Sequence, residues 1–296
     1  MRILLPALIG SLLLVAPATA QFATIPAETV SSGSAGTCGA PEFDHETARW
    51  IEDLLQRRPR AEMMLAPGSV EIPVAFHVVY AGRKGRVSDE QIRVQMENLN
   101  TAFRNTPFTF RLVRVDRTNN RSWYNNCGLL TRNEKNMKRR LSFNPRDTMN
   151  IYSCKTSSYP AKSGVIGYAY FPFMHPESSY MHGPVIHTAT LPGSGDAKYG
   201  IHGMTLVHEV GHYLGVYHTF QGGCQGDGDF VADTPAQARP TGDCSQQDVD
   251  TCPAPGKDDV PNFMNYTGDE CMEHFTALQS ERMVNISSTF RPRLFN

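Results

Sequence analysis

The sequence predicts an α+β fold with α/β-like character in its first half, in which helices cover a mixed, twisted sheet. Three observations predict it. A strand-like run, a helix-like run and a second strand-like run follow one another early in the chain. Several short strand-like runs then precede the next helix. Finally, 24 glycines, 20 prolines and only 19% charged residues favour long irregular connections.

The first three elements have clear local signals. Residues 70–80 are rich in β-branched and aromatic side chains, as in a buried strand. Ser88 and Gln91 form a capping-box pattern that begins a helix. Apolar residues then recur on one face of that helix at Ile92, Met96, Leu99 and Phe103. Residues 108–115 alternate between apolar and polar, which predicts a second strand.

Shorter elements follow. Residues 148–152, 167–171 and 184–188 are strand candidates. Near the end, Thr276 and Gln279 again form a capping-box pattern, which predicts a C-terminal helix. One face of that helix carries Met283, Ile286 and Phe290.

Composition narrows the class of protein. The chain has 296 residues, with 28 Lys and Arg against 29 Asp and Glu, and 40% are hydrophobic. This apolar content argues against disorder, and the balanced charge argues against polyanion binding. We therefore expect a monomer without nucleic-acid or membrane partners.

Residues 1–20 have the three parts of a secretory signal peptide: a basic start, an apolar stretch at 3–15 and a small-x-small site ending at Ala20. The alternative is a membrane anchor, but the apolar stretch is shorter than the ~20 residues that span a bilayer. We expect a secreted, extracellular product, in which disulfides persist.

Residues 21–66 are predicted to be a pro-segment, and residues 67–296 the catalytic domain. The early part is rich in small and polar residues, and an amphipathic stretch at 43–55 runs into an arginine-rich sequence at 56–60. This pattern suggests a removable leader with a processing region at the arginines. An ordinary flexible extension is the alternative.

A metal-binding pattern lies in the segment 205–218. Residues four apart share a helix face, so His208 and His212 can present two imidazoles to one zinc ion. Glu209 flanks that ion without having to bind it, and can deprotonate a water held between them. Gly215 can end the helix in the left-handed conformation, which lets His218 return as a third ligand.

The extended motif is unlikely to occur by chance. Its expected frequency in chains of this length and composition is roughly 10⁻⁴ or lower. A purely structural zinc site is the alternative, although such sites are usually closed by four protein ligands. The other seven histidines, including His202 and His274, lack this spacing and are expected to be structural or surface residues.

The segment 208–218, followed by a methionine turn at 262–266, resembles the metzincin zinc endopeptidases. More narrowly, the residues after His218, the Asp233-Thr-Pro sequence, the turn itself and Cys271 resemble the pappalysin-like family, which includes secreted microbial metalloproteases. The resemblance covers residues 67–296. It implies a sheet with a backing helix, a zinc-binding helix, the methionine turn and a C-terminal helix.

The same resemblance implies roles for two residues of the turn. Met264 would form an apolar floor under the metal. Tyr266 would donate a hydrogen bond to the oxyanion of the tetrahedral intermediate, where charge appears only in the transition state.

Disulfides are also implied by the resemblance, as Cys224–Cys252 and Cys244–Cys271, although the sequence alone allows three pairings of these four cysteines. Cys127 and Cys154 are left for a third bridge. Each bridge would stabilise the fold by about 2–4 kcal/mol.

Relatives bind calcium in the loop that holds Asp227, Asp229, Asp233 and Thr234, and such oxygen-rich turns suit this hard cation. A solvated acidic loop is the alternative, since no complete EF-hand spacing is present.

Cys38 remains as the seventh cysteine. Its thiolate could occupy the fourth zinc position in a precursor and keep the enzyme latent, as in the cysteine switch of some metzincins. A free or intermolecularly paired thiol is the alternative.

Together these features predict a secreted zinc endopeptidase that acts on proteins and peptides laid along the strand edge at 167–171. The main alternative is a secreted zinc-containing binding or toxin-like module without catalysis. A metallohydrolase acting on a non-peptide bond is the third.

Overall fold

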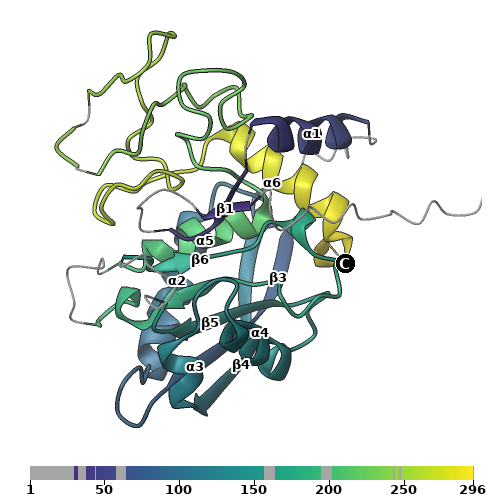
Figure 1. Ribbon diagram of the computed structural model, residues 1–296, viewed down its shortest axis with the longest axis vertical. Helices are drawn as coiled ribbons and strands as arrows, with labels where there is room; N and C mark the ends of the chain where they lie inside the picture. The colour runs from purple at the N-terminus through teal and green to yellow at the C-terminus, as the bar shows by residue number, and fades with distance from the viewer. Residues whose placement is uncertain are drawn as a thin grey trace, which may run out of the picture.

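Strand β3 (Val70–Tyr80) forms where the sequence predicts a buried strand, and it organises the sheet of the computed structural model (Figure 1). It pairs in parallel with β4 (Phe108–Asn119) on one side and β5 (Met149–Cys154) on the other. Beyond β5 lie β7 (Val185–His187), which is parallel to it, and then β6 (Gly167–Tyr168), which is antiparallel to β7. The order is β4-β3-β5-β7-β6, so the predicted mixed sheet is confirmed.

The structure describes residues 30–32, 38–43, 45–57, 65–156, 164–194, 202–242, 244–246 and 248–295. The expected signal peptide at 1–20 and most of the arginine-rich processing region lie outside these ranges. Within them, the helices are too short or too polar to cross a membrane.

Helix α2 (Asp89–Ala102) begins at the predicted capping box. The Ser88 hydroxyl accepts a hydrogen bond from the Gln91 backbone N–H at 3.1 Å, and the Gln91 side chain accepts one from the Ser88 N–H at 3.1 Å. The predicted apolar face is buried in the main core, where Ile92, Met96, Leu99 and Phe103 join side chains of β3. Helix α2 therefore backs the sheet.

Two further helices complete this core. Helix α5 (Met204–Leu214) carries two of the three predicted metal-binding histidines, His208 and His212, and α6 (Ala277–Phe290) is the predicted C-terminal helix. Reciprocal bonds between Thr276 and Gln279 form the capping box that starts α6. The two helices contact each other, so α6 supports the helix that carries His208 and His212.

Helices α3 (Arg121–Asn125) and α4 (Arg132–Leu141) were not expected from the sequence. The buried face of α4 carries Met137 together with two charged residues, Glu134 and Lys138, so it has no apolar periodicity to detect. The Lys138 ammonium donates to two backbone carbonyls at 2.8 and 3.0 Å and lies 3.4 Å from the Glu134 carboxylate. Those partners allow both charges to be buried.

The predicted strand at 167–171 is shorter than expected. It ends at Tyr168, and the chain then leads into a 3₁₀ turn, η2 (Pro172–Met174), whose first residue lacks a backbone N–H. The other 3₁₀ turns are η3 (Thr188–Thr190), after β7, and η5 (Pro292–Phe295), after α6.

The N-terminal segment docks on the rest of the protein. Strands β1 (Val30–Ser32) and β2 (Pro41–Phe43) form an antiparallel pair, and α1 (His45–Gln56) follows. Figure 1 shows α1 lying beside α6. From this segment Phe43, Ala48 and Ile51 pack in an apolar cluster with Phe171, Phe173, Tyr217, Ile286 and Phe290.

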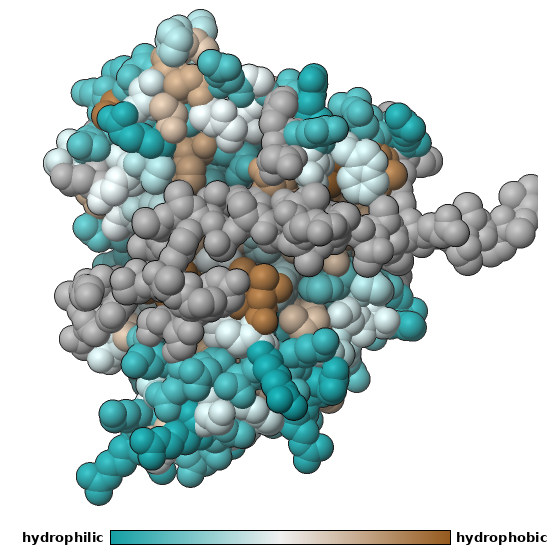
Figure 2. All heavy atoms as spheres, in the orientation of Figure 1, coloured by the Kyte–Doolittle hydropathy of each residue, from teal (hydrophilic) through white to brown (hydrophobic). Residues whose placement is uncertain are grey.

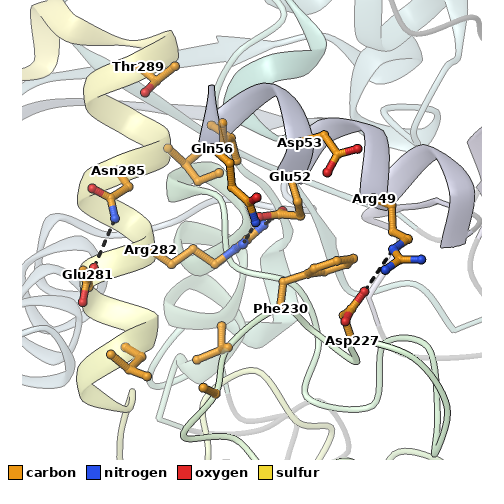
Figure 3. A pocket seen from close by; sticks show the side chains of 15 residues that line it. Arg49, Glu52, Asp53, Gln56, Asp227, Phe230, Glu281, Arg282, Asn285 and Thr289 are labelled. Carbon is orange, nitrogen blue, oxygen red and sulfur yellow. Dashed lines mark hydrogen bonds and ion pairs between the residues drawn. The ribbon is translucent and has the colours of Figure 1, made fainter. Parts of the chain in front are cut away.

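An ion pair adds to this docking. The Arg282 guanidinium of α6 is bidentate to the Glu52 carboxylate of α1 (Figure 3). Its Nε also donates to the Gly215 carbonyl at 2.9 Å. Arg49 and Asp227 form a more exposed pair at 3.2 Å. These residues line a cavity of about 600 Å³ between α1 and α6, which does not reach the histidines of α5.

Candidate metal centre

Three imidazoles converge at the end of α5. The Nε2 atoms of His208, His212 and His218 lie 3.0–3.2 Å from one another, and all three side chains are buried. Nitrogen ligands of one tetrahedral zinc ion are about 3.3 Å apart. The sequence-predicted histidines are therefore brought together at the spacing that such an ion requires.

Hydrogen bonds set the orientation of two rings. The Nδ1 of His208 lies 2.7 Å from the Phe263 carbonyl, and that of His212 lies 2.8 Å from the Val216 carbonyl. A carbonyl only accepts, so each Nδ1 carries the proton and each Nε2 presents a lone pair. Burial lowers the pKa of His208 to about 4, which keeps the ring neutral. Lone pairs facing one another at this distance repel unless a cation lies between them, so the donor set fits a metal ion.

Gly215 makes the turn between the second and third histidines. Its φ is +107°, a left-handed conformation that favours glycine. A Cβ at this position would also lie 2.4 Å from Cγ2 of Ile286 in α6. Two constraints therefore require glycine where the chain turns back toward the site.

Glu209 lies in the same buried site. Its Oε2 has no hydrogen-bond partner within the described residues, and burial raises the pKa of the carboxyl to about 8, although a hydrogen bond with Cys38 opposes that rise. A nearby divalent cation would lower the pKa again. The carboxylate is thus placed beside the histidines with one oxygen available to another molecule.

Gly167 of β6 sets the position of that carboxylate. A Cβ built on Gly167 would lie 2.7 Å from Oε1 of Glu209 and 2.9 Å from Cγ2 of Thr205. The helix and the strand edge can approach this closely only because residue 167 has no side chain.

Replacing Gly167 by Ala is therefore expected to displace the Glu209 carboxylate and to lower kcat/KM for a peptide by roughly 10- to 100-fold. Gly242→Ala is the matched control, since a Cβ there meets no atom within 4 Å. Steady-state assays of both variants check this. Equal activities would show that the close approach has no catalytic role.

Cys38 reaches the histidines from the N-terminal segment. Its sulfur and the three ring nitrogens all lie within 4.8 Å of one another, and all four residues are buried. The neighbouring Gly39 N–H donates to the Gly167 carbonyl at 2.8 Å, and Cys38 forms a parallel bridge with Gly167. The N-terminal segment therefore occupies the strand edge where the sequence predicts that a substrate lies.

The methionine turn lies against α5. Met264 is fully buried, and a Cβ on Gly211 would lie 2.4 Å from its sulfur, so the thioether packs directly on the helix backbone. The Tyr266 ring centroid is 4.9 Å from that of His218 and 5.7 Å from that of His208. Both residues are thus beside the histidine cluster.

Residues 132–288 match the model of a peptidase family described as pregnancy-associated plasma protein-A, the pappalysins. An extracellular metalloprotease of Arthroderma benhamiae is 34% identical over 259 residues, which cover 86% of this chain and 84% of that protein. The chain belongs to the pappalysin family. Another pappalysin-like relative, an extracellular metalloprotease of Pyricularia oryzae, is 37% identical over 263 residues, covering 86% and 89% of the two chains.

Solved structures agree with this pappalysin assignment. A promirolysin mutant from Tannerella forsythia matches with a TM-score of 0.74 and 28% identity, covering 88% of this chain and 97% of that one. Mature mirolysin in complex with a cleaved peptide matches with a TM-score of 0.67 and 29% identity, covering 77% and 96%. The metzincin fold is therefore confirmed, and this pappalysin is a metalloendopeptidase that acts on proteins or peptides.

Three disulfides stabilise the pappalysin chain. They join Cys127–Cys154, Cys224–Cys252 and Cys244–Cys271. The last two are the pairs that the family resemblance implies, and the first joins the two cysteines left for a third bridge. The last two lie in the long loop between α5 and α6, which has little regular structure. The Cys244–Cys271 bridge ties this loop to the residues just after the methionine turn at 262–266.

The acidic residues of that loop point to different partners. Asp227 pairs with Arg49, and Asp233 accepts bonds from the Thr276 hydroxyl at 2.6 Å and the Leu278 N–H at 3.0 Å. The buried Asp229 accepts from the Thr234 hydroxyl at 2.8 Å. Among the described residues, these carboxylates do not converge as the histidines do.

Two glycines of the site were missed by sequence reasoning. The sequence places Gly211 within the metal-binding motif and Gly167 at the start of a strand whose edge is expected to hold the substrate, but it indicates no close contact at either position. No local sequence pattern marks either glycine. Glycine is required at 211 because Met264 approaches closely there, and at 167 because Glu209 does, and both side chains come from other elements of the fold.

Proposed function

We propose that this protein is a secreted zinc endopeptidase made as a latent precursor, with zinc held by His208, His212 and His218 and proton transfer by Glu209. The observation that carries the proposal is the convergence of three Nε2 lone pairs beside a buried carboxylate with an unused oxygen. A module that used zinc only for structure would have no need of that carboxylate.

The position of Cys38 must be considered in the alternative that the zinc site is purely structural. Three histidines and one cysteine would make a closed four-ligand set, which is typical of structural zinc. However, Cys38 belongs to the segment 21–66 proposed for removal, whereas the histidines belong to the proposed catalytic domain at 67–296. Loss of that segment would open the fourth position and the strand edge at Gly167 together.

We assign the following residues roles in peptide-bond hydrolysis. Glu209 accepts a proton from the attacking water and later donates it to the leaving amine. The Tyr266 phenol donates a hydrogen bond to the oxygen on which negative charge develops. Gly167 presents backbone hydrogen-bonding groups to an extended peptide. Zinc, when bound, supplies Lewis-acid polarisation of the scissile carbonyl and acidification of water.

Secretion is proposed from the signal-peptide pattern at residues 1–20, and the extracellular names of the relatives support it. Calcium binding by Asp227, Asp229, Asp233 and Thr234 stays a prediction. The engagement of Asp233 by the start of α6 means that this residue would have to bind a cation through its remaining lone pairs.

His218→Ala tests the metal site. We expect the zinc content, measured by mass spectrometry of the metal, to fall from about one ion per chain to near zero, because two imidazoles bind far more weakly than three. His274→Ala is the control, since that histidine pairs with Asp259 outside the cluster. Chelation should abolish peptide hydrolysis, and added zinc should restore it. Full zinc content in His218→Ala would contradict the proposed ligand set.

A further inference from the structure

Positive charge is concentrated in one part of the chain. Residues 104–146 contain eleven Lys and Arg side chains and only two acidic residues, Asp116 and Glu134, although the whole chain has a net charge of -1. The net charge of the whole chain is close to zero, and on that ground no polyanion partner is expected. It does not reveal that the basic residues are clustered. Ten of the eleven basic side chains are exposed, and only Lys138 is buried.

Most of these residues share one end of the molecule. Nine of the eleven come from the edge strand β4, from α3 or from α4, which lie together at the lower end of Figure 1, away from α1 and α6. The same end is covered largely by hydrophilic side chains in Figure 2. The basic surface is thus separate from the segment that covers the histidines.

A groove lies within this surface. It has a volume of about 510 Å³, and its lining includes Arg114, Arg117 and Arg140 together with Asn120 and the half-buried indole of Trp123. Guanidinium groups bind carboxylates and sulfates through two parallel hydrogen bonds, and an indole offers an apolar face to a sugar ring. The groove therefore combines the two kinds of contact that an acidic sugar needs.

The ion pairs already present leave capacity for such a ligand. Arg140 makes no ion pair within the described residues. Arg117 pairs with Asp89, whose side chain is 89% exposed, and an exposed pair of this kind is weak and readily exchanged. Asp116, the acidic residue in the lining, accepts a hydrogen bond from Arg114 Nε at 2.8 Å and lies 3.2 Å from the buried His77 ring. This bond uses the Nε donor of Arg114 and leaves the N–H groups of its terminal nitrogens for a ligand.

We propose that the groove between β4, α3 and α4 binds an acidic polysaccharide, with Arg114, Arg117 and Arg140 holding its sulfate or carboxylate groups and Trp123 packing on a sugar ring. A flat membrane surface fits a recessed groove less well. Binding here would hold the enzyme in an acidic matrix without blocking its peptide-binding edge, and it does not depend on the catalytic roles proposed above.

The full-length protein should bind immobilised heparin and polygalacturonate at low ionic strength and not neutral dextran. The two acidic polymers distinguish sulfate from carboxylate as the preferred group. We expect Kd to rise steeply with salt, as it does when several charges are neutralised together. Replacing Arg114, Arg117 and Arg140 by Gln should raise Kd at least about tenfold.

The control triple variant replaces Arg93, Arg239 and Lys257 by Gln, which removes the same charge from other exposed sites. It should raise Kd less than about twofold. Arg140→Gln alone, which breaks no ion pair, should still weaken binding severalfold if the triple variant fails to fold. Peptide hydrolysis should be unchanged in every variant.

Three results would overturn the proposal. The parent protein could bind neither acidic polymer, or both triple variants could lose affinity equally, which would indicate net charge rather than a site. Single-stranded DNA of matched charge could bind as tightly and with the same dependence on the three arginines, which would assign the groove to nucleic acid instead.

Discussion

Replacing Glu209 by Gln is expected to lower kcat/KM for peptide hydrolysis by roughly 10²- to 10⁴-fold while leaving the zinc content unchanged. Glutamine preserves the size of the side chain and its contact with Gly167, but it cannot accept and return a proton at neutral pH. Such a loss corresponds to about 2.7–5.4 kcal/mol of transition-state stabilisation. Steady-state rates on a quenched peptide, paired with metal analysis, separate the proton-transfer role from metal binding.

Glu281→Gln serves as the control for this substitution. Glu281 lies exposed on α6, so the change removes the same charge at a distance from the histidines. Activity within about twofold of the parent is expected for it. If Glu209→Gln were equally active, Glu209 could not be the base, and if it lost zinc as well, the carboxylate would have to be counted among the metal ligands.

The elements with local signals were predictable from the sequence. Capping boxes at Ser88 and Thr276 require only residues three apart, and they mark where α2 and α6 begin. The histidines of α5 follow from helix periodicity, and the turn at Gly215 from the need for a left-handed residue. These features could be derived because the interactions behind them lie within one or two helical turns.

Features that depend on distant contacts could not be derived in this way. Helix α4 was not predicted because its buried side holds the Glu134–Lys138 pair. The carbonyls that accept from Lys138 belong to the distant segment before β7. The roles of Gly167 and Gly211 depend on side chains that approach from other elements. Total charge likewise gives no information about which residues lie side by side on the surface.

The proposed latency would depend on two separate contacts of the N-terminal segment. At one, Cys38 lies against the three histidines, and its neighbour Gly39 is hydrogen-bonded to the strand edge at Gly167. At the other, α1 is held on α6 by apolar packing and by the bidentate pair between Glu52 and Arg282. The docking of α1 on α6 favours the contact between Cys38 and the histidines, because it keeps the thiol at a high effective concentration near them.

Replacing Cys38 by Ser in the full-length chain is expected to raise the activity of the uncut precursor at least about tenfold. A serine hydroxyl has nearly the same size, but it is not ionised at neutral pH and is a poor zinc ligand compared with a thiolate. The initial rate of peptide hydrolysis measures the effect, provided that intact mass shows the precursor uncut and thermal unfolding shows it folded.

The rate should stay below that of the mature enzyme, since Gly39 still occupies the strand edge and α1 still holds the N-terminal segment on α6. Glu52→Gln provides the comparison, because it weakens the docking of α1 and keeps the thiol in place, and its effect on the rate should be smaller. A Cys38→Ser precursor as latent as the parent would rule out the thiol as the inhibitory group. Latency would then reside in the occupation of the strand edge alone, and a double variant with Glu52→Gln would be needed to release it.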